Sequence, residues 1–157
     1  LEFNVRFGDP ETQAILPRLK SDLLEAMLAA GNESLGKVIK TGGTHWDNRV
    51  CVSVVCASGG YPGNYEKGKL ISGLDEAEKM ADVVVFHAGT KIAPRSTLHA
   101  PRFLSNGGRV LGVTGLGNTI SEAINTTYRA VDKICFEGIH YRRDIGKKAL
   151  PQGRPCS

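Results

Sequence analysis

Tryptophan and cysteine are scarce in this chain, and no part of it is apolar over a long stretch. Its 157 residues include one tryptophan and four cysteines, and aromatic residues make up 6% of the total. No apolar run approaches the roughly 20 residues that cross a bilayer, and no basic start followed by an apolar segment indicates a signal peptide. We therefore expect no membrane partner and a cytoplasmic location.

The cysteines also lack the spacing of a metal site. None of the four belongs to a C-x-x-C pair or to a neighbouring histidine pattern, which argues against zinc. Cys51 and Cys56 lie in an apolar run instead. We expect them to be small buried hydrophobic residues rather than disulfide partners.

Basic residues gather near the end of the chain, whose net charge is +4. They are Arg142, Arg143, Lys147, Lys148 and Arg154. Acidic and apolar residues interrupt them, and no aromatic residues are interleaved as a base-stacking surface requires. We expect a solvated basic face and no nucleic-acid partner.

The most informative segment is EFNVRFGDPET, residues 2–12. Alternate side chains of a strand share a face. A strand here would carry a polar row, Glu2, Asn4 and Arg6, opposite an apolar row, Phe3, Val5 and Phe7. A carboxylate, an amide oxygen and a guanidinium suit Mg²⁺ together with phosphate, although a solvated edge strand would carry the same residues.

Turn and helix signals follow this predicted strand. Asp9 and Pro10 are predicted to begin a helix, as its N-cap and its first residue. Pro17 breaks the helical periodicity, so a second helix is predicted from about Ser21 to Gly31, capped by Ser21 or Asp22. Residues 32–49 are interpreted as a connector whose Trp46 reaches a core.

From Val50 the pattern changes to short apolar runs between glycine turns, which predicts a small antiparallel sheet. The runs are residues 50–57, 69–71, 83–88 and 109–114. Residues 119–134 then carry apolar side chains on one face, which predicts a helix that covers the sheet.

Three features of this half have two interpretations each. The glycine-rich loop 58–63 suits a structural turn better than a phosphate cradle, because the P-loop spacing is missing. His87 ends an apolar strand, where a satisfied core histidine is commoner than a catalytic base. Surface packing explains Tyr141, Arg142 and Arg143 nearly as well as function does.

A family resemblance rests on the string EFNVRFGDPETQ at residues 2–13 and continues in five further segments. These are residues 19–23, 60–63, 86–90, 107–111 and 141–146. In these motifs the sequence resembles the phosphoribosylamine–glycine ligases, which are ATP-grasp enzymes of purine synthesis. The resemblance covers nearly all of residues 1–150 and corresponds to the last third or so of such a ligase. Residues 92–106 depart from the family pattern and are interpreted as a longer basic loop.

The resemblance implies an α+β fold in three parts. Residues 1–49 would be the carboxy-terminal end of an ATP-grasp domain and a connector. Residues 50–150 would form a small antiparallel β domain with a packed C-terminal helix, and residues 151–157 would be a tail or linker.

The implied reaction joins glycine to phosphoribosylamine with ATP, through a glycyl phosphate. By resemblance, Glu2 and Asn4 would bind Mg²⁺ or Mn²⁺ and Arg6 would hold phosphoryl oxygens. Asp9 would recognise a substrate amine or hydroxyl, as an alternative or an addition to its capping role. Most of the ATP pocket would lie upstream, so the isolated chain is expected to be inactive, and fusion to other purine-pathway domains is a further option. The alternative is a noncatalytic carboxy-terminal isoform or interaction fragment.

Overall fold

The computed structural model describes residues 4–40, 43–94 and 102–150, and the structural statements below concern these residues. The first part of the chain is helical, with α1 (Thr12–Ile15), a 3₁₀ turn (Leu16–Arg18), α2 (Leu23–Gly31) and α3 (Leu35–Lys40). The remainder contains β1 (Val50–Ala57), β2 (Leu70–Ile71), α4 (Leu74–Glu78), β3 (Val83–His87), β4 (Thr90–Ile92), β5 (Phe103–Ser105), β6 (Arg109–Gly117), α5 (Ile120–Val131) and a 3₁₀ turn (Lys147–Ala149). None of these helices is long and apolar enough to cross a membrane.

The strands form two antiparallel three-stranded sheets, in the orders β1-β6-β3 and β2-β5-β4. β6 lies in the middle of the first sheet and is buried along nearly its whole length. Val113 of β6 is paired with Val54 on one side and with Val85 on the other. The prediction of a small antiparallel sheet is confirmed, and β1 has the predicted bounds.

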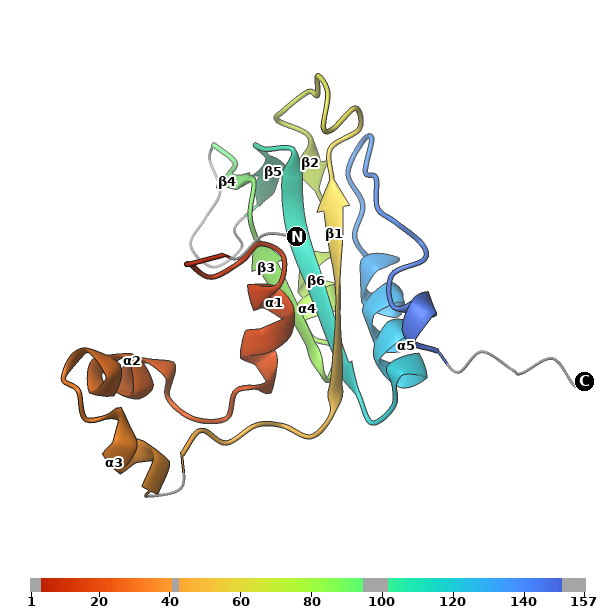
Figure 1. Ribbon diagram of the computed structural model, residues 1–157. Helices are drawn as coiled ribbons and strands as arrows, with labels where there is room; N and C mark the ends of the chain where they lie inside the picture. The colour runs from red at the N-terminus through yellow and green to blue at the C-terminus, as the bar shows by residue number, and fades with distance from the viewer. Residues whose placement is uncertain (1–3, 41–42, 95–101, 151–157) are drawn as a thin grey trace, which may run out of the picture.

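Helices α1 and α5 contact opposite faces of the first sheet (Figure 1). Alternate residues of β6 point to alternate faces. A Cβ at Gly115 would touch Thr127 of α5, whereas the Thr114 hydroxyl donates to the Gln13 carbonyl oxygen of α1 at 3.0 Å. The sheet therefore holds the opening segment of the chain on one face and the helix α5 on the other.

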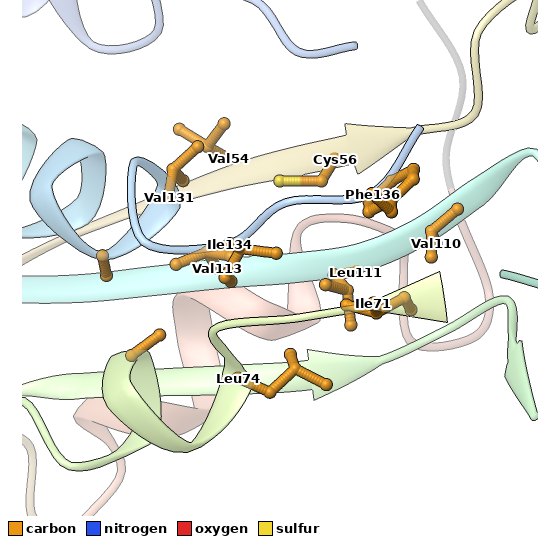
Figure 2. Packing of buried hydrophobic residues seen from close by; sticks show 12 residues of the cluster. Val54, Cys56, Ile71, Leu74, Val110, Leu111, Val113, Val131, Ile134 and Phe136 are labelled. Atoms are coloured by element: carbon orange, nitrogen blue, oxygen red, sulfur yellow. The ribbon is translucent and has the colours of Figure 1, made fainter. Parts of the chain in front are cut away.

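The core lies between the first sheet and the helices α4 and α5, with Ile71 of β2 and the residues after α5 added to it, as Figure 2 shows. The helix predicted over 119–134 is confirmed as α5, which ends at Val131, three residues before the predicted end. Thr119 is its N-cap, and the Thr119 hydroxyl accepts a hydrogen bond from the Glu122 amide. The buried residues of α5 are Ala123, Thr127, Ala130 and Val131. They recur on one face of the helix, as the sequence pattern indicated.

The expectation for the cysteines is confirmed for Cys56, which is buried, and only in part for Cys51, which is half-buried. Cys51, Cys56 and Cys135 are free thiols. Cys56 is fully buried, and burial raises the pKa of its thiol to about 12. Burial also raises the pKa of Cys51, so both thiols are poor nucleophiles at neutral pH.

Helix α2 follows its prediction, whereas the connector after it does not. The Asp22 carboxylate caps α2 by accepting from the Leu24 amide at 2.7 Å, and the helix ends at Gly31. Residues 35–40 form the unpredicted helix α3. Trp46 is 46% exposed, so the prediction that it reaches a core is wrong. Its ring nitrogen donates to the Thr44 hydroxyl, and its backbone bridges to Leu19.

An ion-pair network joins this connector to the sheet. The Asp47 carboxylate accepts from the Arg49 guanidinium at 2.8 Å and pairs with Lys20 at 3.1 Å. Arg49 pairs in turn with Asp82, just before β3. Hydrogen bonds from the Arg49 side chain and backbone hold the pKa of Asp47 well below its usual range.

The predicted opening strand is wrong for its described residues, 4–7, whereas Glu2 and Phe3 lie outside the described residues. Residues 4–9 form no strand, and Val5 and Phe7 are 102% and 57% exposed rather than packed on an apolar face. A strand needs a neighbouring strand to satisfy its backbone hydrogen bonds. No described strand pairs with this segment, so the alternating pattern has no partner to order it.

Candidate functional site

The turn at Gly8 and Asp9 brings the opening segment onto the sheet. The Thr12 amide donates to the Gly8 carbonyl oxygen at 3.1 Å, and the Thr12 hydroxyl donates to the same oxygen. α1 begins at Thr12, with Glu11 as its N-cap residue and no side-chain cap. The prediction that Asp9 is the N-cap and Pro10 the first helical residue is therefore wrong. The helix starts two residues later because a backbone carbonyl closes the turn.

The Asp9 carboxylate contacts Arg109 and Gln13. Arg109, the first residue of β6, lies with Nη1 3.3 Å from one Asp9 carboxylate oxygen and donates to the Asp9 carbonyl oxygen at 3.0 Å. The Gln13 amide nitrogen donates to the other carboxylate oxygen at 3.1 Å. Both carboxylate oxygens are thus engaged, one from the sheet and one from α1.

Arg109 also contacts the glycine-rich loop. Its Nε donates to the Tyr61 hydroxyl at 3.2 Å. This hydrogen bond and then the charge of Asp9 raise the pKa of Arg109, so its positive charge is permanent. Three segments far apart in the sequence, those around Asp9, Tyr61 and Arg109, therefore meet at one place.

A cleft of about 370 Å³ opens at this meeting point. Its lining comprises Asp9, Pro10, Val55, Ala57, Tyr61, Arg109, His140, Tyr141 and Arg142. The lining thus combines basic, acidic and aromatic residues with the apolar residues Pro10, Val55 and Ala57. Such a lining suits a small ligand that carries both an anionic group and a hydrogen-bond donor.

The segment 141–145 is fixed to α5 beside the cleft. The Tyr128 hydroxyl donates to the Arg142 carbonyl oxygen at 2.7 Å and accepts from the Ile145 amide at 3.1 Å. Arg142 pairs with Asp144 through two hydrogen bonds, at 2.9 and 2.7 Å. Arg143 lies over the Tyr141 ring, 5.0 Å from its centre. Packing accounts for Arg143, whereas Tyr141 and Arg142 also line the cleft.

The structure describes only two of the three residues of the predicted polar row at the metal site. Glu2 lies outside the described residues, and Asn4 and Arg6 are exposed. Arg6 donates to the Phe7 carbonyl oxygen at 2.8 Å. Across the described ranges, no group of three or more histidine, cysteine or acidic side chains could hold a metal ion. The oxygen donors of Glu2 and Asn4 fit a hard cation in kind, but any site they form needs further ligands.

Glycines allow close packing in and around the glycine-rich loop. A Cβ at Gly108 would lie 2.1 Å from a Tyr61 ring carbon, so the glycine allows the ring to lie against the backbone just before β6. Gly60 has a φ of +94°, which an L side chain rarely adopts. The loop holds Tyr61 beside Arg109.

His87 is not a core histidine, because it lies at an exposed end of β3. Its Nδ1 is 3.0 Å from the Thr90 hydroxyl, and its ring lies 4.3 Å from that of Phe103. Phe103 belongs to β5, a strand within the segment interpreted as a loop. His87 is not in the lining of the cleft.

Sequence reasoning missed Tyr61 and Arg109 as site residues. The signal for both was the Gly-Gly pair before Arg109, because adjacent glycines permit close approach of a ring to the backbone. Without the fold, that signal does not say which ring approaches.

Several known proteins resemble this chain. Residues 51–148 match the family described as "Phosphoribosylglycinamide synthetase, C domain". A phosphoribosylamine--glycine ligase of Synechocystis sp. is 52% identical over 150 residues, which is 96% of this chain and 33% of that protein. A bifunctional purine biosynthetic protein of Dictyostelium discoideum is 44% identical over 151 residues, 96% of this chain and 17% of that protein.

The fold agrees with a solved relative. The crystal structure of a phosphoribosylamine--glycine ligase from Thermotoga maritima is similar with a TM-score of 0.65 and 34% sequence identity, covering 92% of this chain and 32% of that chain. The α+β fold class is thereby confirmed. The chain spans about a third of the length of these two ligases. The family match extends over more than half of the chain, which therefore belongs to the phosphoribosylglycinamide synthetase family and contains its C domain.

Proposed function

We propose that the chain is the carboxy-terminal part of a phosphoribosylamine–glycine ligase and that it supplies one wall of the substrate site. The observation that carries the proposal is the cleft, whose lining includes Asp9, Arg109 and Arg142. Phosphoribosylamine carries a phosphate, hydroxyls and an amine. The exposed guanidinium of Arg142 suits its anionic group, and the Asp9 carboxylate, which Arg109 contacts, suits its hydrogen-bond donors.

The proposed reaction has two steps. A carboxylate oxygen of glycine attacks the γ-phosphorus of ATP, which forms glycyl phosphate and releases ADP. The amine of phosphoribosylamine then attacks the acyl carbon, so that an amide bond forms, phosphate leaves and the amine loses a proton. Anionic groups repel each other in the first step, and positive charge placed beside the phosphoryl group lowers that barrier.

The residues of the opening motif have separate roles in this proposal. Arg6 holds oxygens of the transferring phosphoryl group, and Asp9 accepts a hydrogen bond from a substrate amine or hydroxyl. Glu2 and Asn4 offer carboxylate and amide oxygens to Mg²⁺ or Mn²⁺, which such donors suit. Bound there, the ion would neutralise phosphate charge. Two protein ligands leave most of an octahedral shell to phosphate oxygens, water or other residues.

Ligase turnover tests the proposal directly. The part of the Synechocystis ligase that precedes its matched region would be joined ahead of Leu1 of this chain. We expect this fusion to release ADP only when Mg²⁺, glycine and phosphoribosylamine are all present, and the 157-residue chain alone to release none. A fusion that folds and binds ATP but releases no ADP would contradict the proposal and favour the noncatalytic interaction fragment.

We also propose the domain division at residue 49, because apolar exposure changes there. Large exposed hydrophobic side chains before residue 50 are Val5, Phe7, Ile15, Leu24, Met27, Leu28, Leu35, Ile39 and Trp46. After it, those among the described residues are Leu70, Val84 and Ile92. The main core cluster lies within residues 54–136, and α2 and α3 extend away from the sheets (Figure 1). Residues 1–49 thus suit a place in a preceding domain, which would cover these side chains. Residues 151–157 lie outside the described residues, and we propose them as a tail or linker.

A truncated chain tests this division. We expect residues 50–150 alone to unfold cooperatively in urea, because they keep the core of the first sheet and α5. The midpoint should fall below that of the whole chain, since α1 and the Thr114 hydrogen bond to Gln13 are lost. Circular dichroism would follow the transition in both chains. A broad, non-cooperative change would show that residues 1–49 are part of the same folding unit.

A further inference from the structure

The Asp9 carboxylate is oriented by a chain of contacts that begins in the glycine-rich loop. Tyr61 contacts Arg109, Arg109 contacts Asp9, and Gln13 contacts Asp9 from the other side. Arg109 reaches both the carboxylate and the backbone carbonyl oxygen of Asp9. Nη1 makes both contacts with Asp9, while Nε of the same planar group donates to Tyr61. A guanidinium held at two of its nitrogens has a more fixed orientation than a single point charge.

The start of β6 aims Arg109 at Asp9. Arg109 is paired with Ala57 at the end of β1, where the register shifts between Cys56 and Ala57. Such irregularities redirect the side chains next to them. Ser58 supports the same end of the sheet, because its hydroxyl donates to the Gly107 carbonyl oxygen at 2.9 Å and its amide to that of Gly108 at 2.8 Å.

The ion pair between Arg109 and Asp9 is too exposed for folding stability alone to explain it. The side chains of Arg109 and Asp9 are 40% and 54% exposed, and ion pairs at such exposure contribute little to folding. Both side chains line the cleft instead. Their geometry is most useful if the carboxylate has to meet a ligand at a fixed angle.

We propose that Arg109 is a positioning residue, which together with Tyr61 holds the Asp9 carboxylate ready for the amine or hydroxyl of the substrate. Arg109 acts through Asp9 in this assignment. The inference rests on the proposed function, because it takes the substrate contact of Asp9 from there. It adds a role for the glycine-rich loop, which presents Tyr61 to the guanidinium.

A double-mutant cycle in the fusion ligase tests the assignment. Arg109→Ala and Asp9→Asn are each expected to lower kcat/KM for phosphoribosylamine by about 10-fold or more, and the double variant by no more than Asp9→Asn alone. Arg109→Lys should recover little, because lysine cannot contact Asp9 and Tyr61 together. Arg129→Ala, which removes an exposed arginine of α5, is the matched control and should leave kcat/KM unchanged in either background.

Two outcomes would overturn the assignment while the proposed function stands. They are normal turnover by Arg109→Ala, and effects of Arg109→Ala and Asp9→Asn that multiply in the double variant. A fusion without turnover removes the proposed function and this role in substrate binding with it.

The 157-residue chain provides a readout of positioning that needs no activity. Backbone ¹H–¹⁵N NOE values for Gly8, Asp9 and Glu11 should fall in Arg109→Ala and, less strongly, in Tyr61→Phe. Those of α5 should not change, and Arg129→Ala should alter neither region. Unchanged values for these three residues in Arg109→Ala would show that the guanidinium does not hold Asp9, whatever the ligase assay gives.

Discussion

Replacing Gly115 with alanine is expected to lower the free energy of unfolding by about 2 to 3 kcal/mol. A Cβ at this position of β6 would lie 2.6 Å from the Thr127 hydroxyl oxygen and 2.7 Å from the Thr127 backbone nitrogen. The second atom belongs to the backbone of α5, so a change of side-chain rotamer cannot relieve the clash. The helix would have to move away from the sheet across the main core.

The Thr127 hydroxyl makes this movement more costly. It is fully buried and lies 2.7 Å from the Ala123 carbonyl oxygen of its own helix and 3.0 Å from the Val52 carbonyl oxygen of β1. Moving α5 would separate the hydroxyl from β1 and leave a buried carbonyl oxygen without that partner.

Gly36→Ala is the matched control, because a Cβ at Gly36 would meet nothing within 4 Å. Alanine in the exposed helix α3 should leave stability unchanged or raise it by up to about 1 kcal/mol. Urea unfolding followed by circular dichroism would compare the two variants. Equal stability of Gly115→Ala and the wild type would mean that α5 does not pack against β6 this closely.

The sequence indicated the second half of the fold well because its signals are local. Residues 50–57 alternate between sheet faces and end at a glycine turn, and Thr119 and Glu122 mark the start of α5. The strand β5 was missed because it is short and lies in a segment rich in basic residues and prolines. Residues 103–105 form a strand because they pair with β2 and β4. That pairing depends on tertiary contacts, which local patterns do not contain.

Tertiary pairing also explains why the predicted opening strand is absent from residues 4–7. Its alternation is strong, but a strand forms only when a neighbour accepts its hydrogen bonds. The candidate site shows a similar division. Asp9 was singled out from its own motif, whereas Arg109 lies 100 positions away from it in sequence. No periodicity relates the two, so only the fold reveals that they meet.

In the fusion ligase, Glu2→Ala and Asn4→Ala are each expected to lower the rate of ADP formation by about 10²-fold, or about 2.7 kcal/mol. Both side chains would supply oxygen ligands to the divalent cation in the proposed site. Loss of either ligand leaves the ion less firmly placed beside the phosphate oxygens, whose charge it would neutralise.

The dependence on Mg²⁺ separates this role from a loss of folding. A lost ligand should raise the Mg²⁺ concentration at half-maximal rate, and higher Mg²⁺ should recover part of the turnover. Asn4→Asp is the matched control because it keeps an oxygen donor in the same place, so its half-maximal Mg²⁺ concentration should stay closer to that of the wild type than that of Asn4→Ala. Glu2→Ala with near-normal turnover at every Mg²⁺ concentration would remove Glu2 from the metal site. If the rate fell equally at every Mg²⁺ concentration, the side chain would instead maintain the structure of the site without binding the ion.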